Sequence, residues 1–162
     1  MDRLKTITYT DGDATEPVGD GPKIIVHCCN SVGAWGSGFV LAVSKKWTEP
    51  ELEYRKLRSP ITLGSIQMVE VDSDLWVCNL VGQDHIRPKG GIPPIRYEAF
   101  RKGFKTLAIE ARSRSASIHM PRMGCALAGG SWKIVELLID DELVDEGLDV
   151  TVYDFDGGVF NP

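Results

Sequence analysis

The sequence predicts an α/β fold in which a mixed central sheet lies between two layers of helices, an α/β/α sandwich. Apolar strand-like segments alternate with segments of helical periodicity through most of the 162 residues. The segment Lys23 to Cys29 is apolar on both faces, as a central strand covered by helices requires. Two strand-like segments within 65–81 have no helix between them and add an antiparallel hairpin. We expect residues 1–162 to form one domain.

Each element follows from periodicity and from its flanking residues. Leu4 to Thr10 alternates in polarity and predicts the first strand, and Val150 to Phe155 predicts the last. Thr48-Glu49-Pro50-Glu51 has the form of a capping box with Thr48 as the N-cap. The other strands are predicted at 23–29, 65–71, 75–81 and 117–120, and the helices at 39–47, from 48 to about 57, at 97–111 and from about 131. Gly82 to Pro94 is expected to be irregular, and loops of this length are typically functional or mobile.

Two of the predicted strands end in glycine-rich loops that lead into helices. Asn30 to Gly38 follows strand 23–29, and Gly124 to Gly130 follows strand 117–120. A helix N-terminus directs backbone N–H groups and the positive end of its dipole toward an anion. Ligands of open α/β sheets lie beyond the carboxyl ends of the strands. One such loop is as readily an ordinary turn, whereas two in equivalent positions predict a site that grips the two phosphates of a diphosphate.

Charge and motif content argue against several other classes. The net charge of −5 opposes nucleic-acid binding, and neither the dinucleotide fingerprint nor the Gly-Lys-Ser/Thr of a P-loop is present. The four cysteines, Cys28, Cys29, Cys78 and Cys125, contain no C-x-x-C pair, so we expect no metal site and no cofactor. No apolar run is long enough for a membrane span, and the first residues lack a signal-peptide core. We expect a cytoplasmic monomer.

The two loops resemble those of the macrodomain family. The resemblance is carried by His27-Cys28-Cys29-Asn30-Ser31-Val32-Gly33-Ala34-Trp35-Gly36-Ser37-Gly38 and by Met120-Pro121-Arg122-Met123-Gly124-Cys125-Ala126-Leu127-Ala128-Gly129-Gly130-Ser131-Trp132. It extends from the Gly12-Asp13 turn to Phe155, nearly the whole chain. It is closest to a compact single-domain branch that includes glutamate/aspartate-directed ADP-ribosyl hydrolases and a yeast ADP-ribose-1''-phosphate phosphatase. The resemblance implies that the ligand is ADP-ribose or an ADP-ribosylated protein.

The resemblance also implies which residues contact the ligand. Asp13 is expected at the adenine amine, Phe155 against the adenine ring and Asn30 at the distal ribose. Without the loops, Asp13 would be interpreted as a turn residue and Phe155 as a core aromatic. The expected ligand-binding residues are Asp13, Ala14, Asn30, Gly33, Trp35, Gly36, Ser37, Gly38, Phe39, Met123, Gly124, Cys125, Ala126, Leu127, Ala128, Gly129, Gly130 and Phe155.

The sequence departs from the better-known catalytic macrodomains. Val40 stands where one hydrolase group has an aspartate, and Gln83 and Ala128 stand where another has its lysine nucleophile and partner aspartate. Catalysis would therefore depend on a positioned water and on electrostatics. The candidate catalytic residues are Asn30, Gln83, Asp84 and His85. Gln83 or the ligand's own diphosphate would orient the water, and Asp84 or His85 would accept its proton. His27 and His119 are interpreted as core histidines, which near Asn30 would at most support another residue.

Three functions fit these residues. The favoured one is hydrolysis of the ester between ADP-ribose and acidic side chains of modified proteins, because the loops and Gly82 to Tyr97 look closest to that branch. The alternatives are an ADP-ribose-1''-phosphate phosphatase, which the His27–Gly38 stretch resembles equally, and a non-catalytic ADP-ribose reader, which fits the missing aspartate and lysine.

Overall fold

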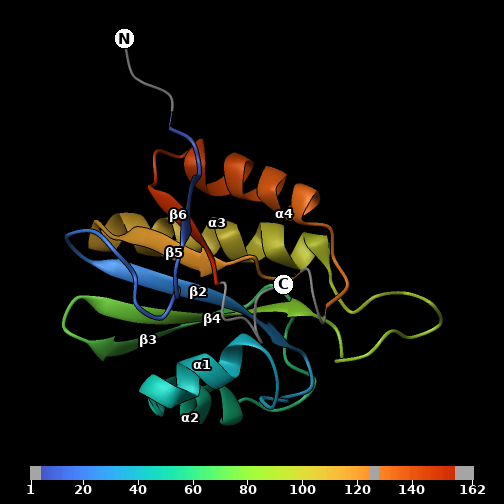
Figure 1. Cartoon of the computed structure of the whole chain (residues 1–162). Helices are drawn as coiled ribbons and strands as arrows, with labels where there is room; N and C mark the ends of the chain where they lie inside the picture. The colour runs from blue at the N-terminus through green and yellow to red at the C-terminus, as the bar shows by residue number, and fades with distance from the viewer. Residues whose placement is uncertain (1–4, 125–127, 156–162) are drawn as a thin grey trace.

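The computed structural model describes residues 5–124 and 128–155, which build a mixed sheet with helices on both faces (Figure 1). The strands are β1 (Thr8–Asp11), β2 (Lys23–Asn30), β3 (Ile66–Asp72), β4 (Leu75–Gln83), β5 (Ser117–Pro121) and β6 (Val150–Asp154). Their order is β1-β6-β5-β2-β4-β3, and all neighbours are parallel except β3 and β4. The predicted fold class is confirmed.

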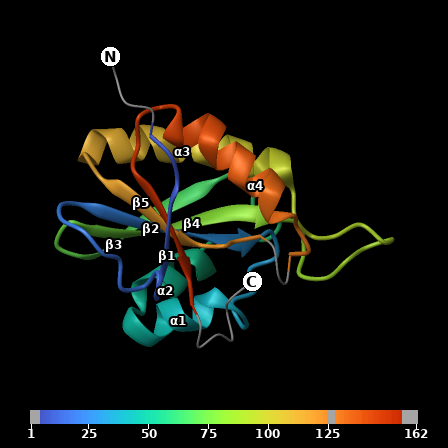
Figure 2. The same ribbon diagram turned by 45° about the horizontal axis from the view of Figure 1, so that its top comes forward.

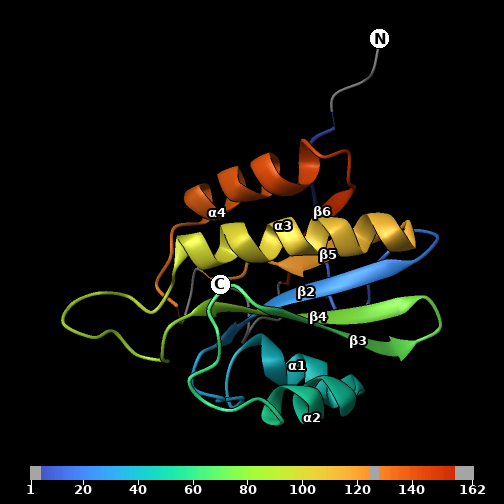
Figure 3. The ribbon, with the colours of Figure 1, turned by 180° about the vertical axis from the view of Figure 1, so that it is seen from behind.

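Two helical layers enclose the sheet. The helices are α1 (Phe39–Lys46), α2 (Glu49–Arg55), α3 (Tyr97–Arg114) and α4 (Trp132–Ile139), which continues into the π-helical turn η1 (Asp140–Val144). Helices α1 and α2 cover one face and α3 and α4 the other, as the views in Figures 2 and 3 show. Within the described ranges, no helix is both long and apolar enough to cross a membrane.

The central strand β2 supplies both cores. Ile24 and Val26 join the core under α3 and α4, whereas Ile25 and Cys29 join the core under α1 and α2. Each of these side chains is almost completely excluded from solvent. A strand that is apolar on both faces is stable only where a helical layer covers each face of the sheet. The sequence therefore predicted its central position correctly.

The antiparallel hairpin of β3 and β4 is confirmed, with the chain reversing between Asp72 and Leu75. Strand β1 is shorter than the predicted Leu4–Thr10, and residues 1–4 lie outside the described part of the chain. Its pairing with β6 extends only from Thr8 opposite Thr151 to Asp11 opposite Asp154. Residues 5–7, which continue the alternating pattern, are therefore not part of a strand in the described structure.

The predicted capping box at the start of α2 is wrong. Thr48 has helical backbone angles and makes no side-chain capping bond. The Glu51 carboxylate instead accepts hydrogen bonds from Ser44 Oγ at 3.0 Å and from Arg55 Nε at 2.8 Å. Glu51 thus links α2 to α1 through Ser44. This tertiary hydrogen bond forms in place of the local capping bond.

Candidate functional site

The carboxyl ends of β2 and β5 lead into the two predicted glycine loops and then into α1 and α4 (Figure 1). These strands are hydrogen-bonded neighbours in the sheet, starting with Lys23 opposite Ser117. Neighbouring strands lie about 4.8 Å apart, so loops that leave them at the same edge begin close together. The topology therefore places both loops at one edge of the sheet.

Asn30 organises the first loop. Its Oδ1 accepts hydrogen bonds from the backbone N–H groups of Val32 at 3.1 Å and Ala34 at 3.0 Å, and its Nδ2 donates to the Ala34 carbonyl at 2.7 Å. The Tyr54 hydroxyl donates to the Asn30 carbonyl at 2.5 Å and lies 2.9 Å from Asn30 Oδ1. The pKa of the Tyr54 hydroxyl is raised above its ordinary value, mainly because the group is buried. The Asn30 side chain holds the loop in shape, a role that the sequence interpretation did not include.

Glycine is required at particular points of this first loop. Gly33 and Gly38 have φ of 83° and 81°, in the region that favours glycine. Gly36 is exposed and has open space around the position of a Cβ atom, and Ser37 is exposed beside it. Gly38 is also the N-cap of α1, which begins at Phe39.

Trp35 lies beneath the loop. Its side chain is 5% exposed and its ring contacts those of His27 and Tyr54, with centroid distances of 5.3 and 5.4 Å. Its Nε1 donates to Ser44 Oγ at 2.7 Å. Trp35 thus supports the loop from the core side. A ligand could contact this residue only through its backbone or through the small exposed part of its side chain.

The second loop is closed by its own glycines. The Gly130 N–H donates to the Gly124 carbonyl at 2.8 Å across the loop, and Gly124 has a φ of 84°. A Cβ atom on Gly130 would lie closer than 3.0 Å to both Ile95 Cδ1 and the Gly124 carbonyl oxygen. The predicted ligand residues Cys125, Ala126 and Leu127 lie outside the described residues. The described ends of the loop leave no room for a side chain at Gly130.

The irregular segment after β4 packs against this second loop. The Ile95 N–H donates to the Ala128 carbonyl at 3.1 Å, and a Cβ atom on Gly129 would come within 3.0 Å of Pro93 Cβ. Met123 and Ala128 are buried. The second loop is therefore held between the core and the 84–95 segment.

Both helices at this edge begin without a side-chain cap. Gly38 and Ser131 are the N-cap residues of α1 and α4, and neither helix has an acidic residue in its first turn. The Ser131 N–H, at the entrance to α4, donates to the Tyr97 hydroxyl at 2.9 Å. A helix start without a capping side chain or an acidic residue keeps its positive dipole end uncompensated by its own side chains, which suits an anion.

Arg122 braces the second loop from outside. Its guanidinium donates to both carboxylate oxygens of Asp154, at 2.6 and 3.0 Å, and lies 5.0 and 5.4 Å from the ring centroids of Tyr9 and Trp132. The hydrogen bond from Arg122 lowers the pKa of Asp154. Sequence reasoning quoted Arg122 within the loop motif but assigned it no role, because its carboxylate partner Asp154 lies on a different strand, β6.

The two residues expected near adenine lie at the carboxyl ends of neighbouring strands β1 and β6. Asp13 Oδ1 accepts hydrogen bonds from the backbone N–H of Thr15 at 2.8 Å and from its hydroxyl at 2.7 Å. Ala14 is buried, and the half-buried Phe155 follows β6 directly. Asp13 therefore forms a turn, as its local sequence suggests, and the hydrogen bonds found for its carboxylate within residues 5–124 and 128–155 use only Oδ1.

Three of the four catalytic candidates lie together at the end of β4, beside Ser31. The Ser31 hydroxyl donates to Asp84 Oδ1 at 2.8 Å and accepts from the His85 N–H at 3.0 Å. Asp84 Oδ2 lies 3.8 Å from Arg96 Nη2, and Asp84 Oδ1 lies 3.7 Å from His85 Nε2. Gln83 Nε2 donates to the His85 carbonyl at 3.0 Å. The buried Ser31 fixes the Asp84 carboxylate, and sequence reasoning had missed Ser31 as its partner.

The other two histidines are buried in the core. His27 Nε2 lies 2.6 Å from Asn79 Oδ1, and His119 is bonded to Ser117 and Tyr153 at 2.7 Å each. Burial lowers both pKa values to about 4. Their interpretation as core histidines is confirmed, although His27 Nδ1 has no hydrogen-bond partner among the described atoms.

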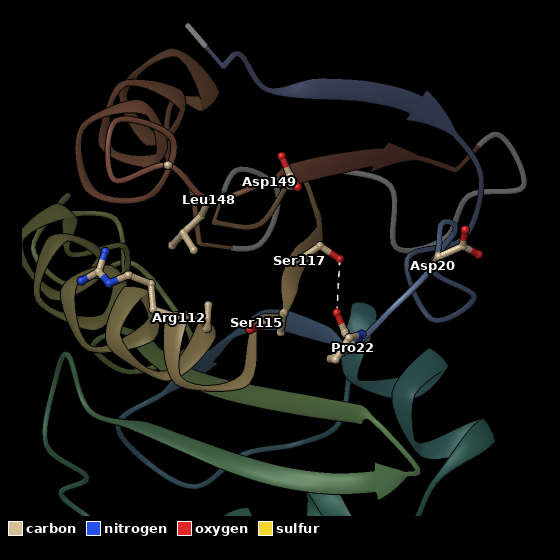
Figure 4. Close-up of a pocket in the computed structure, with 10 residues that line it drawn as sticks. Asp20, Pro22, Arg112, Ser115, Ser117, Leu148 and Asp149 are labelled. Carbon is tan, nitrogen blue, oxygen red and sulfur yellow. Dashed lines mark hydrogen bonds between the residues drawn. The ribbon is translucent and has the colours of Figure 1, made fainter. Parts of the chain in front are cut away.

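A cavity of about 320 Å³ lies at the opposite edge of the sheet (Figure 4). Residues before β2, at the end of α3 and at the starts of β5 and β6 line it. Asp20 and Asp149 supply acidic groups and Arg112 a basic one, and Ser117 Oγ donates to the Pro22 carbonyl at 3.5 Å. This cavity lies at the amino ends of the parallel strands, away from both glycine loops.

The fold and its two loops define a class: mixed α/β proteins with paired glycine loops at the carboxyl edge of the sheet. A Bacteroides thetaiotaomicron protein of unknown function is 48% identical, covering 94% of this chain and 99% of that one, with a TM-score of 0.91. A macrodomain protein from Streptomyces coelicolor is 44% identical over 91% of this chain and 98% of its own, with a TM-score of 0.80. The chain belongs to the macrodomain family.

More distant relatives share the fold or the sequence pattern. The structure of Thermosipho africanus DarTG in complex with ADP-ribose has a TM-score of 0.74 at 17% identity, covering 93% of this chain and 42% of that one. The mouse chromodomain-helicase-DNA-binding protein 1-like is 30% identical over 93% of this chain, which spans only 18% of that protein. An ADP-ribose 1''-phosphate phosphatase from Lodderomyces elongisporus is 24% identical, covering 93% of this chain and 99% of that protein. No family model matches the sequence.

Proposed function

We propose that the carboxyl edge of the sheet binds ADP-ribose, with the diphosphate held between the two glycine loops. The observation that carries this proposal is the pair of uncapped helix starts after neighbouring strands β2 and β5, neither with an acidic residue in its first turn. Two such helix ends directed at one small dianion reinforce each other. The ADP-ribose complex of the distant Thermosipho africanus DarTG, which shares this fold, supports the same ligand class.

The rest of the nucleotide follows from the positions of the predicted residues. In this proposal the adenosine lies toward Asp13 and Phe155, beyond β1 and β6, and the distal ribose lies toward Asn30 and the end of β4. Asn30 contributes mainly by shaping the first loop, because its carboxamide is already bonded to Val32 and Ala34. This orientation brings the distal ribose to the side of the site that holds Asp84.

The reaction we propose there is hydrolysis of an ester between ADP-ribose and a glutamate or aspartate side chain. A water attacks the anomeric carbon of the distal ribose, the bond from that carbon to the ester oxygen breaks, and the side-chain carboxylate leaves. The proton of the water passes to Asp84, which Ser31 and Arg96 hold in place. A carboxylate is a stable leaving group, so positioning and electrostatics carry most of the rate.

A phosphatase acting on ADP-ribose-1''-phosphate is the second candidate. It is favoured by the Lodderomyces relative of that name, which this chain covers almost end to end. The same Asp84-assisted water would then attack at phosphorus. A non-catalytic reader is the third candidate, and it needs only the glycine loops.

Incubation with a glutamate-ADP-ribosylated protein and, separately, with ADP-ribose-1''-phosphate distinguishes the three. We expect release of ADP-ribose from the first and no phosphate from the second. Phosphate release alone would establish the phosphatase instead, and calorimetric ADP-ribose binding without turnover of either would establish the reader. Absence of ADP-ribose binding would overturn the proposal as a whole.

The Asp84→Asn variant tests the proposed base. It keeps an acceptor oxygen for Ser31 but cannot take a proton, so we expect release to slow by about 10² to 10⁴-fold while ADP-ribose affinity changes little. Asp20→Asn, at the opposite edge of the sheet, is the matched control and should retain full activity. Equal rates for wild type and Asp84→Asn would remove Asp84 from the mechanism.

A further inference from the structure

The segment beside the proposed site carries a charge opposite to that of the whole chain. Between Asp84 and Glu98 there is no acidic residue, but there are three basic ones, Arg87, Lys89 and Arg96, in a chain of net charge −5. Residues 85–93, here called the basic arm, extend away from the rest of the fold as the yellow-green loop in Figures 1 and 3. A local reversal of charge at the edge of a site affects which partners approach it.

The tip of the basic arm is a hairpin. Lys89 N–H donates to the Ile92 carbonyl at 3.0 Å, and Ile92 N–H donates to the Lys89 carbonyl at 3.1 Å. Gly90 and Gly91 between them have φ of 60° and 80°, as a two-residue type I′ turn requires. The backbone at the tip of the arm therefore has a defined turn, which places Lys89 and Ile92 opposite one another.

The base of the basic arm is tied to the proposed site. Asp84 N–H donates to the Pro94 carbonyl at 2.8 Å, which closes the segment just beyond the arm. Pro93 packs near Gly129, and the adjoining Ile95 is bonded to Ala128 of the second glycine loop. A partner bound along the arm therefore lies next to both Asp84 and the second loop.

The surface of the basic arm combines charge with apolar area. Arg87 and Lys89 are exposed, and the ion pairs found within the described ranges include neither. Ile86 and Ile92 are 48% and 59% exposed. Two exposed cations outside these ion pairs, flanked by two exposed aliphatic side chains, suit an extended acidic peptide segment.

We propose that the basic arm is a docking surface for the acidic protein segment that carries the ADP-ribosylated residue. This inference rests on the proposed function and adds to it the sequence context of the substrate. The chain's net negative charge disfavours an acidic partner over most of its surface, whereas Arg87 and Lys89 attract one beside the site. The arm thus acts on the protein part of the substrate, and the glycine loops on the nucleotide part.

The test uses two synthetic peptides, each with one ADP-ribosylated glutamate, flanked in one by glutamates and in the other by glutamines. The variant is Arg87→Glu/Lys89→Glu, and its matched control is Lys45→Glu/Lys105→Glu, which makes the same charge change at exposed positions on α1 and α3. Binding of each peptide and of free ADP-ribose is measured by calorimetry at low and moderate salt. The peptide titrations are made with both double variants and the reference protein carrying Asp84→Asn, because this change slows the proposed hydrolysis and leaves the peptide intact during the measurement.

We expect the arm variant to lose about 10-fold or more in affinity for the glutamate-flanked peptide, mostly at low salt, and to bind free ADP-ribose as the wild type does. The glutamine-flanked peptide and the control variant should show much smaller losses. Equal losses in the two double variants, or an unchanged preference for the glutamate-flanked peptide, would overturn the docking role while leaving ADP-ribose binding intact. Failure of the wild type to bind free ADP-ribose would instead overturn the proposed function, and the docking role with it.

Discussion

Replacing Gly130 by alanine tests whether the second loop needs the closed shape seen here. The added Cβ atom would overlap Ile95 Cδ1 and the Gly124 carbonyl oxygen. The isoleucine methyl can rotate away from the new Cβ atom. The Gly124 carbonyl, however, accepts the hydrogen bond from Gly130 N–H that closes the loop, so moving this carbonyl away from the Cβ atom breaks that bond. Overpacking costs about 1–3 kcal/mol and a lost hydrogen bond about 0.5–1.5 kcal/mol, which together give about 3 kcal/mol.

Urea denaturation and thermal unfolding measure this cost. For a domain of this size, a loss of about 3 kcal/mol lowers Tm by about 6–12 °C. ADP-ribose affinity should fall as well, because the opened loop no longer holds its N–H groups in place. Gly36→Ala is the matched control for stability: its Cβ atom has no neighbour within 4 Å, so the free energy of unfolding should change by less than about 0.5 kcal/mol. If Gly130→Ala and Gly36→Ala unfold alike, the loop is not closed as described.

Three further predictions concern the first loop, the adenine end and the buried histidines. Gly38→Glu places a side chain and a negative charge at the start of α1, where φ is 81°, so calorimetry should show no ADP-ribose binding; unchanged affinity would exclude this loop from the site. Asp13→Ala should weaken ADP-ribose binding by about 1–3 kcal/mol if its carboxylate accepts a buried amine, whereas wild-type affinity would leave it a turn residue only. Burial holds the pKa of His27 and of His119 at about 4, below the ordinary 6.5, so the unfolded chain binds more protons between these values and the free energy of unfolding falls as pH falls through that window. The loss from pH 7 to pH 5 should be about 2 kcal/mol for each histidine, and a urea midpoint unchanged over this range would contradict the assignment.

The features that sequence predicted correctly are local and repetitive. The apolar run of β2, the hairpin of β3 and β4 and the stripe of α3 each show their burial in the spacing of their own residues. The glycine loops could be located in the same way, because a strand, a glycine-rich turn and a helix follow one another along the chain. The boundaries that failed, at β1 and at the capping box, are those where a partner far away in the sequence decides the local structure.

The sequence by itself determined the layers, the edge that carries the loops and the residue types available there, since all of these follow from periodicity and from backbone preferences. Only the tertiary structure decided the partners: Arg122 with Asp154, Ser31 with Asp84, and Asn30 with its own loop and Tyr54. Apart from the bonds of Asn30 within its own loop, these pairings join segments that are far apart in the sequence, and nothing in the local pattern of either segment records which other segment the fold brings beside it. The same holds for the basic arm, whose composition was visible in the chain but whose position beside Asp84 and the second loop came from packing.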